Sequence, residues 1–239
     1  MKTYTSFQEL DALGEGLAKK YTGNTHRWNS SCFDIEGFIT DFLKLPILYE
    51  AFAEDDPSKI GFLSDGITPL IVYRAGKKTP IVFPKDTIVI ESFLQRSDES
   101  GRRRFTLAHE AAHFILNRHV PMQTACFHNE YDHEFHYSGE ELAKMFSLNE
   151  TLTNRLGAAV LMPPFLVGRA LKKYNNGQPI VYYTEGVFAP DTKIRLQSMS
   201  DALGVSYSAL INRLRELRLL ECRPIEEYID HAQIGRAHV

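Results

Sequence analysis

Apolar residues recur at helical spacing near the start of the chain and then give way to short runs that suit β-strands. Residues 7–21 and 34–45 carry apolar side chains three and four positions apart, which predicts two amphipathic helices, the second ending before Pro46. The runs that follow are short and are separated mostly by Gly, Pro, Asp or Ser, so they predict a small, mostly antiparallel sheet. Its strands are expected at residues 47–52, 60–63, 70–73 with 81–83, and 87–90.

Helical periodicity dominates the rest of the chain. The strongest pattern covers residues 102–117, and a polar, histidine-rich passage follows it. Breakers then divide the sequence, because Pro163 and Pro164 end one helix and Gly204 separates the last two. The whole pattern predicts an α+β fold. The further helices are expected at 139–146, 148–161, 194–202 and 207–217, with one short strand at 180–183 in a turn-rich segment.

The composition indicates a folded protein and excludes several functional classes. The 239 residues are 44% hydrophobic, which is enough for a core, and the net charge of -3 gives no general attraction to nucleic acid. Cys32, Cys126 and Cys222 are far apart and form neither a disulfide framework nor a CxxC pair. No apolar run reaches the roughly 18 residues of a membrane span, and the start lacks a secretory signal. We therefore expect a cytoplasmic protein with no membrane partner.

The most informative motif is HEAAH at residues 109–113. His109 and His113 lie one turn apart on the predicted helix, so both imidazoles can bind one Zn²⁺ from the same side. Glu110 stands on the adjacent face, where a carboxylate can act as general base on a metal-bound water. Thr106 and Asn117 continue the polar arc on an otherwise apolar helix, which favours a functional site over a chance match to a short motif.

A catalytic zinc site needs a third protein ligand. Six of the nine histidines fall between residues 109 and 136, so several downstream groups qualify. We favour Glu150, because the helix that it begins has an apolar stripe able to pack on the first helix, and Gly157 allows a close approach of the backbones. The alternative is that Glu150 only stabilises a helix N-terminus, where a carboxylate is favourable. The candidates are His119, His128, His133, His136, Glu140, Glu141 and Glu150.

Three motifs occur in an informative order. Residues 104–113 read RFTLAHEAAH, residues 150–154 read ETLTN and residues 161–163 read LMP. This combination resembles the ImmA/IrrE family of bacterial metallopeptidases, whose usual pattern is RFTLAHELGH, then ExxAN, then LLMP. The resemblance extends over residues 34–220, and its departures, such as Ala-Ala for Leu-Gly in the first motif, remove no functional side chain.

The resemblance implies a role for each site residue. His109, His113 and Glu150 would be the ligands of Zn²⁺, and Glu110 would be the general base of a peptide-bond hydrolase. It also implies a zincin-like core, in which the active-site helix packs on a small twisted sheet. The family's substrates are helix-turn-helix transcriptional repressors, whose cleavage activates stress-response or mobile-element genes. The histidines between 128 and 136 have no counterpart, and we favour a loop over a lining of the cleft for them.

The C-terminal part has the rhythm of a helix-turn-helix. Residues 203–206, LGVS, supply a turn and a helix N-cap, and apolar residues give the second helix a buried side. The segment also resembles one that is common in the same family. Arg213 and Arg215 would be available for DNA phosphates or for a protein partner. We favour a scaffold role, since the chain is net acidic and a single such unit binds DNA weakly, so nucleic acid is the less favoured partner.

Two functions compete on these grounds. The first is a zinc-dependent endopeptidase whose protein substrate is, by resemblance, a DNA-binding repressor. The second is a non-proteolytic regulator or toxin–antitoxin partner that binds protein or DNA through the C-terminal helical pair. An intact Glu110 favours the endopeptidase, because a binding module needs no general base.

The expected organisation has five segments. Residues 234–239 match the translation of a short-read sequencing adapter, so we do not expect them to belong to the natural fold. The segments are an N-terminal helix and loop (1–30), a zinc metallopeptidase domain (31–170), a connector (171–190), a helix-turn-helix-like unit (191–224) and a tail (225–239).

Overall fold

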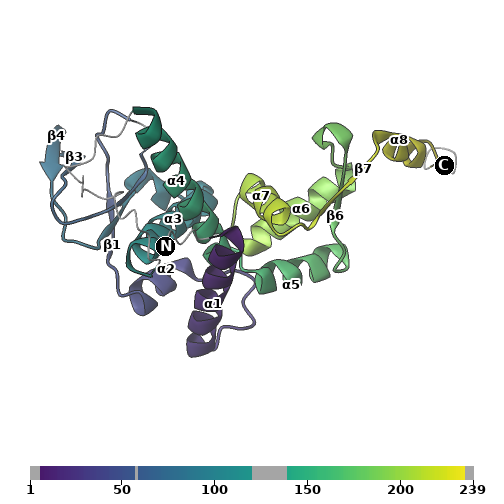
Figure 1. Ribbon diagram of the computed structural model, residues 1–239, viewed down its shortest axis with the longest axis horizontal. Coiled ribbons are helices and arrows are strands. Elements are labelled where there is room, and N and C mark those ends of the chain that lie inside the picture. Colours follow the sequence, from purple (N-terminus) through teal and green to yellow (C-terminus); the bar gives the residue numbers. More distant parts are fainter. Residues whose placement is uncertain (1–5, 57–58, 120–138, 235–239) are drawn as a thin grey trace. The chain divides into compact units, whose positions relative to one another are not determined.

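The fold combines helices with small sheets, as the α+β prediction requires. It is given by a computed structural model that describes residues 6–56, 59–119 and 139–234 (Figure 1). None of the helices in this described part combines the length and apolar character that crossing a bilayer requires.

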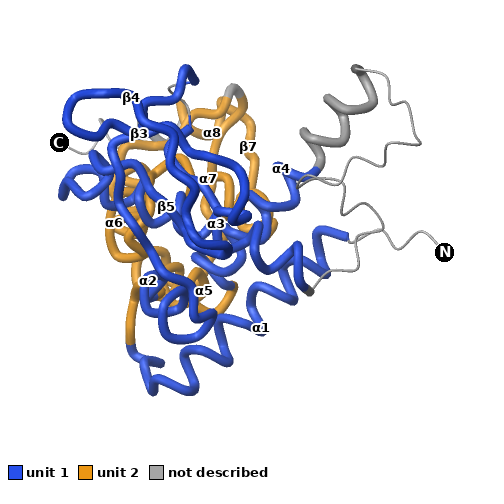
Figure 2. Tube along the Cα trace, turned by 90° about the vertical axis from the view of Figure 1, so that its left-hand side faces the viewer, with its two compact units in different colours: residues 1–29, 34–163 blue, residues 30–33, 164–239 orange. Residues whose placement is uncertain are grey.

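The chain divides into two compact units, which Figure 2 colours separately. Unit 1 contains residues 1–29 and 34–163, and unit 2 contains residues 30–33 and 164–239. The chain therefore passes between the units three times, because the short segment 30–33 belongs to unit 2 while both of its flanks belong to unit 1.

Unit 1 opens with the helix α1 (Phe7–Thr25), whose start is fixed by a capping box. The Ser6 hydroxyl accepts the backbone N–H of Glu9, and the Glu9 side chain accepts the backbone N–H of Ser6. The helix ends at His26, which adopts the left-handed conformation with φ of 54°. The predicted helix is confirmed here, and it is about one turn longer than its apolar pattern indicates.

The helix expected at residues 34–45 is present but divided. Asp34 caps α2 (Ile35–Gly37) by accepting the backbone N–H of Gly37, and a π-helix follows at Phe38–Phe42. Tyr21 of α1 donates its hydroxyl to the same Asp34 carboxylate at 2.9 Å. This hydrogen bond ties the first helix to the start of the second.

The strands of unit 1 correct one prediction. The described strands of unit 1 form two sheets rather than one, with an isolated bridge between Phe52 and Val72, and their pairing is mostly antiparallel as predicted. In the larger sheet, of order β1-β5-β2, β1 and β5 run parallel, because the intervening strands supply the long connection that parallel pairing needs. The strands are β1 (Ile47–Glu50), β2 (Gly61–Leu63), β3 (Leu70–Arg74), β4 (Lys77–Ile81) and β5 (Ile88–Glu91).

The central strand β5 is covered on both faces. Val89 packs in one cluster with Leu70, Val72 and Phe83 of the β3–β4 hairpin region. Ile88 and Ile90, also fully buried, point to the opposite face by the alternation of side chains along a strand. The helix α3 (Ser100–His119) contacts β5 and β2, and two short 3₁₀ helices, η2 (Ser92–Gln95) and η3 (Ser97–Glu99), lead from β5 into it. The helix that carries the HEAAH motif thus packs on the small sheet.

The long helix α4 (Gly139–Leu161) corrects a second prediction, because the two helices expected at 139–146 and 148–161 are one. Glu150 lies well inside it, so the explanation of Glu150 as a carboxylate at a helix N-terminus does not apply. A Cβ at Gly157 would stand 3.1 Å from the backbone oxygen of Ala108 on α3, so this glycine allows the expected close approach.

A second glycine brings α1 equally close to α4. A Cβ at Gly14 would lie 2.6 Å from Cβ of Ala159 and 3.0 Å from its backbone carbon, and neither atom can move away easily. At Gly16, on the exposed side of the same helix, there is nothing within 4 Å.

We therefore expect opposite effects of the same substitution at these two positions. Gly14→Ala should lower the free energy of unfolding by about 1–3 kcal/mol, because overpacking outweighs the gain in helix propensity. Gly16→Ala should raise it by about 0.5–1 kcal/mol through propensity alone. Urea unfolding of both variants measures the difference, and a Gly14→Ala variant as stable as Gly16→Ala would contradict the close packing of α1 on α4.

Unit 2 confirms the predicted strand and the last two helices and adds elements that the pattern missed. Gly204 ends α6 in the left-handed conformation with φ of 65°, and Ser206 caps α7 by accepting the N–H of Ala209. The strands β6 and β7 pair in parallel, and α5, β7 and α8 were not predicted. The elements are α5 (Pro164–Asn175), β6 (Ile180–Tyr183), η4 (Thr184–Gly186), α6 (Pro190–Leu203), α7 (Tyr207–Glu216), β7 (Leu220–Arg223) and α8 (Ile225–Ile234).

Burial in α7 corrects the expectation for one of its two arginines. Arg213 is fully buried next to Leu214 and Leu210, and its guanidinium donates to Glu216 at 3.0 Å. A phosphate or a protein partner cannot reach it in this structure. Arg215 is exposed, and its contact with a substrate or with DNA stays a prediction.

Candidate metal centre

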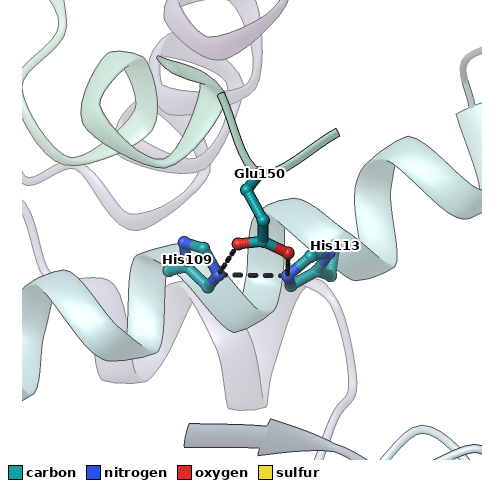
Figure 3. A group of neighbouring side chains, drawn as sticks. All are labelled: His109, His113 and Glu150. Atoms are coloured by element: carbon teal, nitrogen blue, oxygen red, sulfur yellow. Dashed lines mark hydrogen bonds and ion pairs between the residues drawn. The ribbon is translucent and has the colours of Figure 1, made fainter. Parts of the chain in front are cut away.

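The two histidines of the HEAAH motif point to the same side of α3 (Figure 3). Their Nε2 atoms are 3.0 Å apart, and the rings meet nearly edge to face. The rest of the helix is held rigidly, since Leu107, Ala111 and Ile115 are buried. The site is therefore built on a fixed element rather than on a loop.

Glu150 reaches the two histidines from α4, as Figure 3 shows. Its carboxylate oxygens lie 3.2 Å from Nε2 of His109 and 3.5 Å from Nε2 of His113. One ligand atom from each residue falls within a group no wider than 4.8 Å. Tetrahedral zinc with bonds of about 2.0–2.1 Å separates its ligand atoms by about 3.3 Å, so the donor set and spacing fit Zn²⁺.

The outer nitrogens of both imidazoles have hydrogen-bond partners. Nδ1 of His109 lies 2.9 Å from the amide oxygen of Asn154, and Nδ1 of His113 lies 3.4 Å from the hydroxyl of Thr153. An amide oxygen can only accept, so it keeps the proton of His109 on Nδ1 and leaves the lone pair of Nε2 free for a metal. Both partners come from the turn of α4 that follows Glu150.

Asn154→Ala is expected to weaken zinc binding by about 10–100-fold, because His109 loses the partner that fixes its tautomer and ring orientation. Competition with a zinc indicator measures this affinity. Asn212→Ala, on the exposed side of α7, is the matched control and should bind zinc as wild type does. Equal zinc affinities in the two variants would show that Asn154 does not support zinc binding.

The charges around His109 favour its protonated form when no metal is bound. Burial by itself lowers the pKa of this imidazole, but the hydrogen bond that the imidazole donates to Glu150 and the charges of Glu110 and Glu150 outweigh it and raise the pKa above its ordinary value. The same negative charges favour a divalent cation, which takes the place of the proton.

Glu110 lies beside the candidate ligands and is shielded from solvent. Its side chain is buried, and this burial raises the pKa of its carboxyl to about 7. The charge of Glu150 raises this pKa further, whereas His109 and the backbone N–H of Leu63, which donates to the carboxylate, lower it. A carboxyl with a pKa near neutrality can both accept and return a proton at physiological pH.

The structure does not describe the side chains of the other candidate ligands. His128, His133 and His136 lie outside the described part of the chain, as do the side chains of His119, Glu140 and Glu141. The pattern also missed two neighbours of the site on α4, Thr153 and Asn154, and one on β2, Leu63. The Thr153 and Asn154 side chains follow Glu150 by one helical turn, a spacing that signals a shared face, whereas the contact of Glu110 with β2 depends on tertiary structure.

Fold and site together define a helix that carries two histidines and a buried glutamate, completed by a carboxylate from a second helix, which is the arrangement of HExxH metallopeptidases. The family model described as the IrrE N-terminal-like domain matches residues 91–215, just over half of the chain. The chain belongs to this metallopeptidase family, which uses zinc, and the resemblance to ImmA/IrrE is thereby confirmed. A search of curated proteins finds no match to the sequence.

Proposed function

We propose that the protein is a zinc endopeptidase of the ImmA/IrrE type that hydrolyses a peptide bond in a helix-turn-helix transcriptional repressor. The observation that supports it most is the convergence of His109, His113 and Glu150 beside a buried Glu110 whose pKa is about 7. A structural zinc site needs no such carboxyl and is closed by four protein ligands, whereas the described residues bring three together. The repressor as substrate, and the release of the genes that it silences, rest on the family resemblance.

Each residue of the site has its own role in the proposed hydrolysis. His109, His113 and Glu150 would hold Zn²⁺, which supplies Lewis acidity toward a peptide carbonyl and a water molecule. Glu110 accepts a proton from the attacking water and returns it to the nitrogen of the leaving amine. Asn154 and Thr153 keep the two imidazoles oriented while this happens.

The test is to incubate the zinc-loaded protein with the helix-turn-helix repressor encoded nearest to its gene. We expect two fragments, seen by intact-mass spectrometry, whose masses add up to the repressor plus one water. The same mixture with Glu110→Gln should contain only the intact repressor.

A stable complex without cleavage would support the alternative instead. In that case the protein acts as a non-proteolytic regulator or toxin–antitoxin partner, and the helical pair α6 and α7 is the first surface to test. Arg215→Ala would then weaken the complex, because this arginine is exposed on α7.

A further inference from the structure

The strand β2 lies at the end of the sheet order β1-β5-β2, with α3 next to it. Two backbone hydrogen bonds to β5, from Glu91 N–H to Ile60 C=O and from Ser64 N–H to Thr87 C=O, are each 2.9 Å long. In an antiparallel pair, alternate residues direct their backbone groups to the partner strand, so Gly61 and Leu63 direct theirs away from β5. This geometry leaves the N–H of Leu63 free to donate to Glu110.

Gly61 lies against the same carboxylate. A Cβ at this position would overlap Oε1 of Glu110, and it would lie 3.1 Å from Cδ of Glu110 and 2.7 Å from Cγ2 of Thr106. Both neighbours belong to α3, one turn apart. Side chains of α3 thus occupy the space beside Gly61, so there is no room for even a methyl group at this position.

The two neighbours differ in how easily they can move. Thr106 is buried and β-branched, and its hydroxyl donates to the Arg102 carbonyl at 3.0 Å, so its rotamer is fixed. The Glu110 carboxylate is the free end of a longer side chain with more rotatable bonds. A side chain at position 61 would therefore be accommodated chiefly by displacing the carboxylate of Glu110.

We propose that Gly61 is a positioning residue for the general base, and that β2 acts through it together with the N–H of Leu63. The glycine lets the strand approach α3, and the Leu63 N–H then holds the Glu110 carboxylate in one place. This inference rests on the proposed function, since it assigns Gly61 a role through the base of the same reaction.

The first test compares the kinetics with which Gly61→Ala and wild type cleave the repressor. We expect kcat to fall by about 10²-fold, the effect of a misplacement of about 1 Å, with KM and zinc content unchanged. Gly168→Ala, at a helical glycine with nothing within 4 Å, is the control and should keep wild-type kcat. A Gly61→Ala variant with wild-type kcat, or one that fails only by losing zinc, would overturn the proposal.

The second test does not depend on activity. Urea midpoints of zinc-free wild type, Gly61→Ala, Glu110→Ala and the double variant form a double-mutant cycle. We expect Gly61→Ala to lower the midpoint less in the Glu110→Ala background, because the carboxylate that it overlaps is gone. Equal shifts in both backgrounds would show that the two residues are not coupled and would overturn the proposal. If wild type cleaves nothing, the proposed function fails, and this cycle alone decides whether Gly61 positions Glu110.

Discussion

Glu110→Gln should bind zinc as tightly as wild type and hydrolyse its substrate about 10²–10⁴-fold more slowly, the usual contribution of a general base. The amide has nearly the shape of the carboxylate, so it can remain against Gly61, and its oxygen can still accept the N–H of Leu63. It cannot take a proton from water at neutral pH. Single-turnover cleavage, followed beside metal analysis of the same sample, separates the two effects.

A matched control variant tests whether the loss of activity is specific to Glu110. Glu15→Gln removes a carboxylate from α1 that pairs with Lys19 at 2.9 Å, and it should cleave at the wild-type rate. If Glu110→Gln keeps more than a tenth of the wild-type rate, the proton is transferred by another group, and the proposed role of Glu110 is wrong.

Glu150→Ala is expected to have the largest effect on metal binding. It removes one of the three proposed ligands. Loss of a hydrogen-bond partner of a ligand lowers zinc affinity by about 10–100-fold, and loss of the ligand itself should lower it further. Zinc at a hundred times its dissociation constant stabilises a folded protein by about 2.7 kcal/mol, so the thermal midpoint of wild type should rise with added zinc. The midpoint of Glu150→Ala should not respond to the same zinc concentration.

The control for this variant is Glu36→Ala. The two glutamate side chains are almost equally exposed, at 52% for Glu36 and 53% for Glu150, but Glu36 pairs with Arg103 instead of two histidines. Glu36→Ala should therefore keep both zinc and its thermal response. Retention of one zinc per chain by Glu150→Ala would mean that the third ligand is a different residue, with the histidines after His119 as the next candidates.

Local patterns predicted the parts of the site that lie on one helix. The spacing of His109 and His113 follows from helical geometry alone, and the apolar stripe that begins near Glu150 indicated a second helix packed on the first. The sequence placed Glu150 at a helix start because residues 139–146 and 148–161 carry separate apolar patterns. The structure joins them in one helix, and residues 146–149, FSLN, contain no Gly or Pro that would end it.

Contacts that depend on strand pairing were not predictable. The neighbours of Glu110 on β2 are far away in sequence, and which backbone groups of β2 point toward α3 depends on its register with β5. Likewise, β7 consists of four residues, Leu-Glu-Cys-Arg, an alternation too short to predict a strand, so only its pairing with β6 identifies it as one. The burial of Arg213 shows a related limit, because an arginine is expected at the surface even where, as here, it follows a buried leucine by three positions on a helix.

The three passages between the units affect how the protein can be divided into fragments for expression. A fragment that begins at residue 164 would lack Phe33, which is almost fully buried, and Ser30, whose carbonyl accepts the guanidinium of Arg169 at 3.3 Å. A fragment limited to the family match at 91–215 would lose β1, β2 and nearly all of β5, and with them the strand that contacts Glu110. Truncation at the boundaries of the family match would therefore remove part of the surroundings of Glu110, whereas point substitution leaves them whole.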